Sequence, residues 1–387
     1  MRDNKITDSI YYVGCYDNDI DLFESQYKAP HGITYNSYVI FDEKITIMDT
    51  VDKRKEKEWK ENLDIVLDGK EPTYLVVQHV EPDHSANIKY LTEKYPNMQV
   101  IASQKAFEFI NQFFKVDLSD RAVVVKEGDK VSLGKHELNF VSAPMVHWPE
   151  VILTYESTEK ILFSADAFGK FGEFNLDDGW EDEARRFFIN IVGRYGMQVQ
   201  ALLKKAAALD INKICPLHGP VLEENLSYYI DKYDTWSSYR AESDGVLVLY
   251  NSIHGNTRNA IEKLEEILKD KGVKDYKVFD LARTEMSVCI ANAYKYEHLI
   301  LASPTYDMGL FPHTDLLLKS LKHKSYQNRK VGLIENGSWA PCSGKLMKEE
   351  FESMKDIVIA EPVVTIKSSI DEEGINNINI MVENLLK

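Results

Sequence analysis

The chain has 387 residues, 44% of them hydrophobic, which suffices for two or three packed domains if a domain takes about 150 residues. Its 62 acidic residues outnumber its 46 basic residues, and the net charge of −16 argues against a nucleic-acid or anionic-membrane partner. No stretch has the pattern of a signal peptide or the roughly 18 apolar residues of a membrane helix, so we expect a cytoplasmic protein.

Short runs rich in β-forming residues dominate the first part of the chain. They lie at 35–41, 44–50, 74–80, 98–103, 121–126, 136–143, 151–157 and 160–168. Charged, helix-compatible stretches separate some of these runs, and residues 181–209 and 221–239 also have helical patterns. This part of the chain therefore predicts a mixed α/β domain with two sheets between helices.

The pattern changes at GVLVLYN, residues 245–251, where a nearly continuous apolar strand precedes the helical stretch NAIEKLEEILKDKG. The alternation repeats with the apolar segments YKVFDL, HLILASP, KVGLIEN and VVTIK. Apolar strands that alternate with helices are typical of a doubly wound parallel sheet. We therefore place a boundary near residue 242 and predict two domains, residues 1–242 and 243–387.

Four side chains that can bind metal crowd the segment QHVEPDHSAN, residues 78–87, just after the apolar run YLVV. Alternate residues of a strand point to one side, so His79 and Glu81 can leave the strand end together. Asp83 and His84 arrive from the following turn. Taken alone, the segment could equally be a polar surface loop.

Three further candidates lie at the ends of later apolar runs: His147 in APMVHWPE, Asp166 in LFSADAFG and His218 in CPLHGPV. A single histidine is more often structural, but seven nitrogen and oxygen ligands at successive strand ends are hard to explain by packing. Imidazole suits iron and zinc alike, whereas the carboxylates of Glu81, Asp83 and Asp166 favour iron. The set therefore predicts a metal site.

These spacings resemble the metallo-β-lactamase superfamily, whose usual motif H-x-H-x-D-H is followed by a histidine, a bridging aspartate and a histidine. Here Glu81 stands in place of the second histidine. With that exchange the chain resembles the flavodiiron proteins, also called A-type flavoproteins, over essentially its whole length. The resemblance implies a metallo-β-lactamase-like αβ/βα sandwich followed by a flavodoxin-like doubly wound parallel sheet that binds FMN.

The segment SIHGNT lies between the strand at 245–251 and the helix that follows it. Small and hydroxyl residues in such a turn allow backbone N–H groups and the helix N-terminus to hold a phosphate. An ordinary βα turn capped by Asn or Thr is the alternative. The segment resembles the flavodoxin phosphate loop S/T-x-T-G-x-T, with His254 in place of the middle threonine.

Two further loops, SPTYDMG and NGSWAP, follow apolar strands at the positions where flavodoxins hold the isoalloxazine ring. The last of them departs from the family's commoner sequence G-S-Y-G-W. The candidate FMN-binding residues of the three loops are Ser252, His254, Gly255, Asn256, Thr257, Pro304, Thr305, Tyr306, Asp307, Asn336, Gly337, Ser338, Trp339 and Ala340.

The resemblance also implies a division of the metal site between two iron ions. The ligands would be His79, Glu81 and His147 for one ion, Asp83, His84 and His218 for the other, and Asp166 as the bridge. Tyr195 in GRYG resembles a tyrosine of the family that hydrogen-bonds the bound ligand, and an amphipathic helix residue is the alternative. His31 is a candidate to approach the iron pair, with an ordinary turn histidine as the alternative.

Flavodiiron proteins reduce dioxygen to water or nitric oxide to nitrous oxide, with electrons passed singly from FMN to the iron pair. The resemblance implies an external electron donor such as rubredoxin, which would be a separate chain because the four cysteines include no C-x-x-C pair. It also implies a head-to-tail homodimer, or a dimer of dimers, in which the FMN of one protomer lies beside the iron pair of its partner. The choice between the two gases stays open.

Two other functions fit parts of the sequence. A zinc-dependent hydrolase of the metallo-β-lactamase type, fused to a flavodoxin-like domain, would explain the histidines. Glu81 argues against it, and the second domain would be idle. An electron carrier with a vestigial metal site would explain the second domain, but it would not need all seven candidate ligands.

Overall fold

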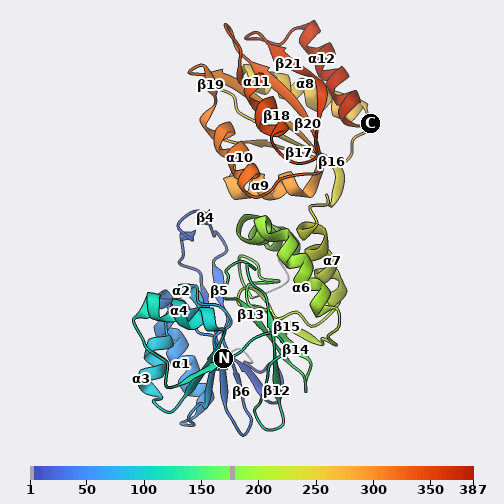
Figure 1. Cartoon of the computed structure of the whole chain (residues 1–387). Helices are drawn as coiled ribbons and strands as arrows, with labels where there is room; N and C mark the ends of the chain where they lie inside the picture. The colour runs from blue at the N-terminus through green and yellow to red at the C-terminus, as the bar shows by residue number, and fades with distance from the viewer. Residues whose placement is uncertain (1–3, 175–178) are drawn as a thin grey trace. The chain divides into compact units, whose positions relative to one another are not determined.

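The computed structural model describes residues 4–174 and 179–387 of the chain. The chain divides into two compact units, Met1–Asp234 and Thr235–Lys387, each with its own sheets (Figure 1). The division falls within helix α7, Leu226–Ser237, and the boundary near residue 242 stays a prediction. Across the two described ranges, no helix combines the length and apolar character needed to cross a membrane.

The first unit contains two mixed sheets. The first sheet is antiparallel from β1 to β7 and parallel from there on, in the order β1 (Ile10–Tyr12), β6 (Tyr38–Ile40), β7 (Thr46–Met48), β8 (Tyr74–Val76), β9 (Gln99–Ala102) and β10 (Ala122–Val124). The second sheet is antiparallel except for its last pair, in the order β11 (Lys130–Ser132), β12 (Glu137–Ser142), β13 (Ile152–Glu156), β14 (Ile161–Phe163) and β15 (Lys213–Cys215).

Two short strand pairs and a set of helices complete this unit. The pairs are β2 (Cys15–Asp17) with β5 (Ile33–Tyr35), and β3 (Leu22–Phe23) with β4 (Tyr27–Lys28). The helices are a 3-10 turn at Lys53–Lys55, α1 (Glu56–Leu67), α2 (Pro82–Ser85), α3 (Ile88–Lys94), α4 (Gln104–Phe114), α5 (Trp180–Phe187), α6 (Gly196–Ala206) and α7.

Both faces of the first sheet are buried, which explains why its strands are almost continuously apolar. Val39 packs in one core with Trp59 of α1 and Ile110 of α4. Its neighbour Ile40 packs in another core with Phe140 of the second sheet, because successive strand residues point to opposite faces. The predicted sandwich of two sheets between helices is therefore confirmed.

The helical stretch predicted at 181–209 is interrupted. Helix α5 ends at Phe187, and a π-helical turn at Phe188–Val192 and a 3-10 turn at Gly193–Tyr195 separate it from α6. Gly193 and Gly196 each lower helix propensity by about 1 kcal/mol relative to alanine, so the sequence favours a break at this place. The predicted helical pattern at 181–209 is therefore present, but it is divided between α5 and α6.

The second unit is built on a parallel sheet. Its strand order is β17 (Tyr276–Asp280), β16 (Ser243–Tyr250), β18 (Tyr296–Tyr306), β20 (Arg329–Asn336) and β21 (Ile357–Ile366), and β19 (Gly309–Leu310) pairs with the end of β18. The helices are α8 (Asn256–Asp270), α9 (Met286–Lys295), α10 (Pro312–His323), α11 (Ser343–Glu352) and α12 (Glu372–Leu385).

Helices cover both faces of this sheet (Figure 1). Leu264 of α8 and Met381 of α12 pack with Val248 and Ile300 of the central strands in one core, while α9, α10 and α11 lie on the other side. The predicted doubly wound parallel sheet is confirmed, and its order places the first strand β16 between β17 and β18. Ligands of such folds bind at the carboxyl ends of the strands, where the strand order reverses.

Candidate metal centre and ligand pocket

The seven candidate metal ligands lie at strand ends of the first unit. His79 follows β8, and Glu81 directly precedes α2, where Pro82 takes the first helical position and fixes the turn. Asp83 and His84 lie within that short helix. The other three come from loops after later strands: His147 between β12 and β13, Asp166 after β14 and His218 after β15.

His79, Glu81, His147 and Asp166 form one group, in which the potential ligand atoms all lie within 4.8 Å of one another. Nε2 of His79 and Nε2 of His147 are each 3.2 Å from Oε2 of Glu81. Oδ2 of Asp166 is 3.1 Å from Nε2 of His147 and 3.5 Å from Nε2 of His79. Two imidazole nitrogens and two carboxylate oxygens therefore surround one point, as they do around transition-metal ions.

Asp83, His84 and His218 form the second group, again within 4.8 Å. The Nε2 atoms of His84 and His218 are 3.1 Å apart. Oδ2 of Asp83 lies 3.3 Å from Nε2 of His84 and 3.4 Å from Nε2 of His218. Oδ1 of Asp166 lies 3.2 Å from Nε2 of His84. Asp166 thus directs one carboxylate oxygen toward each group.

These atoms have the chemistry of a site for two metal ions. Oδ1 of Asp83 and Oδ1 of Asp166 are enclosed, and neither accepts a hydrogen bond from the described residues. An enclosed carboxylate oxygen that accepts no hydrogen bond is costly, and a cation would satisfy both oxygens. Glu81, Asp83 and Asp166 together supply three negative charges for that purpose.

Hydrogen bonds behind two of the rings select the nitrogen that faces the centre. Nδ1 of His79 lies 2.7 Å from the carboxylate of Glu150, and Nδ1 of His218 lies 2.7 Å from the carbonyl of Thr34. Carboxylate and carbonyl oxygens only accept hydrogen bonds, so both rings carry the proton on Nδ1 and present Nε2 to the centre. Sequence reasoning missed Glu150 and Thr34, because these contacts join residues 71 and 184 positions apart.

The electrostatics of the centre favour positive charge. Burial lowers the pKa of His79, but Asp166 and Glu150 outweigh this effect and raise it well above its ordinary value. Against the same effect of burial, Asp166 and Glu81 raise the pKa of His147 to about 9. Despite burial, the neighbouring histidines hold the pKa of Glu81 well below its usual range. With raised pKa values these histidines also carry a proton on Nε2, the nitrogen that faces the centre. A metal ion that binds there must displace this proton.

The two predicted catalytic side chains lie outside both groups of ligand atoms. Tyr195 is half-buried at the end of the 3-10 turn before α6. His31 is exposed in a turn after β4, where its carbonyl accepts a hydrogen bond from the hydroxyl of Tyr16. The roles of Tyr195 and His31 stay predictions.

A cavity of about 500 Å³ opens beside the metal centre. Its walls come from the β3–β4 hairpin, from β5, from the segment before α1 and from the start of α2. The lining residues are Ile20, Asp21, Leu22, Phe23, Glu24, Ser25, Tyr35, Asp52, Arg54, Glu81, Pro82 and Asp83. Two candidate ligands, Glu81 and Asp83, therefore border a space large enough for a small molecule.

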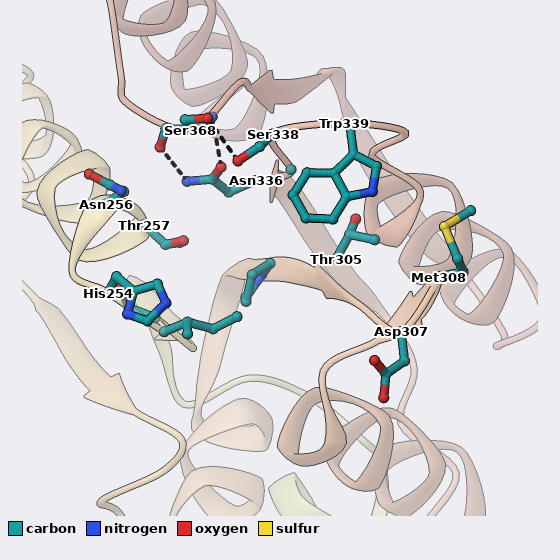
Figure 2. Close-up of a pocket in the computed structure, with 14 residues that line it drawn as sticks. His254, Asn256, Thr257, Thr305, Asp307, Met308, Asn336, Ser338, Trp339 and Ser368 are labelled. Carbon is teal, nitrogen blue, oxygen red and sulfur yellow. Dashed lines mark hydrogen bonds between the residues drawn. The ribbon is translucent and has the colours of Figure 1, made fainter.

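The second unit has a pocket of about 410 Å³ at the carboxyl ends of its strands (Figure 2). All candidate FMN-binding residues line it except Gly255, Tyr306 and Ala340. Ile253, Met308 and Ser368 line it as well, and sequence reasoning missed them. Ser368 lies in the chain after β21, so a motif search in the three loops could not have found it.

One side of the pocket is formed by the segment SIHGNT and the N-terminus of α8. The residue before this helix is Gly255 with φ +92°, which has no side chain of its own to cap the helix. Ser252 Oγ accepts the N–H groups of Gly255 and Arg258 at 3.1 and 3.3 Å. The other N–H groups of the first helical turn are left for an anion, and Figure 2 shows Thr257 and His254 facing the pocket beside them.

The opposite side of the pocket is a braced loop that carries an exposed aromatic ring. Asn336 exchanges two hydrogen bonds with the backbone of Ser368, at 3.0 and 3.2 Å, and the hydroxyls of Ser368 and Ser338 are 2.8 Å apart (Figure 2). Trp339 is 80% exposed and Met308 is 67% exposed, although both line the pocket. This combination suits a ligand with a phosphate at one end and a planar, largely apolar ring at the other.

Comparisons with known proteins agree with the folds of both units. The family described as ODP family beta lactamase matches residues 33–219. A nitric oxide reductase of Moorella thermoacetica is 30% identical over 376 residues, which cover 94% of this chain and 92% of that protein. The rubredoxin oxygen:oxidoreductase of Desulfovibrio gigas has a TM-score of 0.92 at 26% identity, covering 99% of this chain and 97% of that one. A flavodiiron protein of Giardia intestinalis shares the fold, with a TM-score of 0.91 at 22% identity over 100% of this chain and 96% of that one.

Proposed function

Because the chain belongs to the flavodiiron protein family, we propose that it reduces dioxygen to water or nitric oxide to nitrous oxide at a pair of iron ions. The observation that carries the proposal is the pair of ligand groups that share Asp166. A hydrolase needs no electron supply, so the pocket of the second unit also favours an oxidoreductase.

Iron is the proposed metal because three of the seven ligands are carboxylates. His79, Glu81 and His147 would hold one ion, and Asp83, His84 and His218 the other, with Asp166 between them. Hard oxygen donors favour iron over zinc, and Glu81 adds one such donor at a position where zinc hydrolases of this fold have a histidine. When bound, the iron pair supplies the electrons and the coordination sites that gas reduction needs.

FMN is the proposed ligand of the second-unit pocket. The start of α8, with Asn256 and Thr257, would hold the phosphate. Thr305, Ser338 and Trp339 would contact the ring system. FMN accepts electron pairs and releases single electrons, and this chain would contribute the orientation of its ring.

The electron donor and the assembly are further parts of the proposal. One similar protein is named a rubredoxin oxygen:oxidoreductase, which supports rubredoxin or a similar low-potential protein as the donor. Another similar protein is named a nitric oxide reductase. The first name supports dioxygen as the substrate, and the second supports nitric oxide. We propose a head-to-tail homodimer, or a dimer of such dimers, in which electrons pass from the FMN of one protomer to the iron pair of the other.

The test combines metal analysis with rapid mixing. Purified protein should contain two iron ions and one FMN per chain. After anaerobic reduction, mixing with dioxygen or nitric oxide should reoxidise the flavin within seconds, and the faster gas identifies the substrate. Two zinc ions together with thioester or β-lactam cleavage would support the hydrolase instead. Flavin that neither gas reoxidises would refute the proposed function.

A further inference from the structure

Tyr35 is a buried tyrosine whose hydroxyl has no hydrogen-bond partner in the part of the chain that the structure describes. It ends strand β5, and the residue is 1% exposed. Its ring lies edge-on to the ring of His218, with centroids 6.0 Å apart. Within residues 4–174 and 179–387, no group forms a hydrogen bond with its hydroxyl. Buried tyrosine hydroxyls normally have a partner, so the position of this one calls for a ligand.

The neighbours of Tyr35 fix its position relative to the metal centre. The carbonyl of Thr34 lies 2.7 Å from Nδ1 of His218, and the hydroxyl of Thr34 accepts the N–H of Gly219 at 2.6 Å. On the other side, Nδ2 of Asn36 donates to the carbonyl of Gly219 at 2.9 Å. Three consecutive residues thus contact the loop that carries His218, and the ring of Tyr35 has little freedom to turn away.

Tyr35 borders the cavity beside the metal centre. Tyr35 lines this cavity together with Glu81 and Asp83, and its hydroxyl is not among the enclosed polar atoms. A tyrosine hydroxyl has an ordinary pKa of about 10, so at neutral pH it carries its proton and can donate a hydrogen bond into this cavity.

Tyr38 shows what a structural tyrosine in the same segment looks like. It is also 1% exposed, but its hydroxyl donates to the carbonyl of Pro216 at 3.1 Å, and it does not line the cavity. The two residues lie three positions apart. The hydroxyl of Tyr38 has a protein acceptor, whereas the hydroxyl of Tyr35 lies at the cavity. Tyr38 is therefore a matched control for Tyr35.

Resting on the proposed function, we propose that the hydroxyl of Tyr35 donates a hydrogen bond to the small molecule held at the Asp83 side of the centre. Dioxygen and nitric oxide both gain negative charge as they accept electrons, and a fixed neutral donor stabilises that charge without reorganisation. In this role Tyr35 is a catalytic residue, because its hydroxyl contacts the substrate directly.

The test compares Tyr35→Phe with Tyr38→Phe in the full-length, iron- and FMN-loaded protein. Azide serves as a hydrogen-bond-accepting probe of the oxidised centre, followed by absorption spectroscopy, and the N–O stretch of bound nitric oxide is measured by infrared spectroscopy. Tyr35→Phe should weaken azide binding about tenfold, shift the N–O stretch and slow flavin reoxidation about tenfold, with an unchanged urea midpoint. Tyr38→Phe should lower the urea midpoint and leave the other three quantities unchanged.

Two outcomes would overturn this role. Wild-type azide affinity and an unshifted N–O stretch in Tyr35→Phe would mean that the hydroxyl makes no contact with the bound molecule. A fall in its urea midpoint as large as that of Tyr38→Phe would mean that the hydroxyl is structural. A wild-type protein that reacts with neither gas would instead refute the proposed function, so the two failures are distinguishable.

Discussion

Glu150 is a buried carboxylate that holds a candidate metal ligand in place. Its Oε1 lies 2.7 Å from Nδ1 of His79 and accepts the N–H of Val80 at 3.0 Å. These contacts fix the orientation of the His79 ring and keep its Nε2 directed at the centre. A comparable carboxylate, Glu156, is just as buried but accepts the N–H groups of Thr158 and Glu159, away from the ligands.

We therefore expect Glu150→Ala to weaken metal binding about 10- to 100-fold, because His79 loses the acceptor that orients it. Competition with a chromophoric chelator measures the affinity. Glu156→Ala is the control, since it should destabilise the fold and leave metal affinity unchanged. Equal metal affinities for Glu150→Ala and the wild type would show that His79 is oriented by packing alone.

His136 and Asp42 form a buried ion pair outside both groups of candidate metal ligands. Oδ2 of Asp42 lies 2.8 Å from Nδ1 of His136 and also accepts its backbone N–H at 2.6 Å. Burial lowers the pKa of His136, but Asp42, Glu156 and Glu159 raise it above its ordinary value. Against burial, His136 lowers the pKa of Asp42 to about 2.

The two shifts define a pH window for the stability of this pair. The raised pKa of His136 contributes stability below about pH 6.5, which is lost as the pH rises through the folded-state value. The lowered pKa of Asp42 contributes stability above about pH 4, and this stability is lost as the pH falls toward the folded-state pKa of about 2. His136→Gln should therefore lower the free energy of unfolding by about 2 kcal/mol between pH 4 and 6.5, and by less at pH 9.

Urea titrations of the variant and the wild type across this range provide the measurement, and their difference cancels the other titrating groups. The exposed His31 supplies the control, because His31→Gln should leave the free energy of unfolding nearly unchanged at every pH. A His136→Gln effect that is independent of pH would mean that the pair acts by packing and not by charge.

At the scale of elements, helices α8 and α12 of the second unit begin in opposite ways. The Oδ1 of Asp371 caps α12 by accepting the N–H of Gly374 at 2.8 Å. The residue before α8 is Gly255 in a left-handed conformation, which offers no side chain as a cap, and Ser252 Oγ satisfies only the N–H of Arg258 in the first turn. The start of α8 therefore keeps N–H groups that can bind a ligand, and it borders the pocket.

This contrast predicts different consequences for two substitutions. Thr257 is 3% exposed and lines the pocket, so Thr257→Val, which keeps its shape, should weaken FMN binding about tenfold through the lost hydroxyl. Asp371→Ala should lower the free energy of unfolding by about 1 kcal/mol and leave FMN affinity unchanged. Quenching of FMN fluorescence gives both affinities. If Thr257→Val bound FMN as tightly as the wild type, the hydroxyl of Thr257 would not be part of the proposed phosphate site.

At the scale of the whole molecule, apolar side chains surround the second-unit pocket. Trp339, Met308 and Ile253 line it and are 80%, 67% and 47% exposed. A cluster of this kind on a chain with a net charge of −16 is typical of a surface that another protein covers. The proposed homodimer would cover it with the partner protomer.

Dilution tests the proposed homodimer. Steady-state turnover per chain should fall as the protein is diluted through the dissociation constant of the dimer, because electrons must pass between protomers. The internal control is the rate at which the donor reduces FMN in the same samples, which should not change. Full turnover by a monomer, identified by light scattering at the same concentration, would contradict the proposal.

The sequence by itself was sufficient for features encoded by near neighbours in the chain. His79 to His84 lie within six positions, and apolar runs preceding each loop place those residues at strand ends. Alternating apolar strands and helices likewise predicted the parallel sheet of the second unit. Such features depend on local backbone geometry and burial, which a single stretch of residues specifies.

Only the tertiary structure revealed the residues that act from a distance. Glu150 and Thr34 meet their histidines across 71 and 184 positions, and Ser368 braces Asn336 across 32. The hydroxyl of Tyr35 lies at the cavity whereas that of Tyr38 donates to Pro216, and the sequence pattern of β5 and β6 does not encode this difference. The physical reason is that a hydrogen bond between distant segments depends on how the whole chain packs, whereas a ligand motif depends on residue type and spacing.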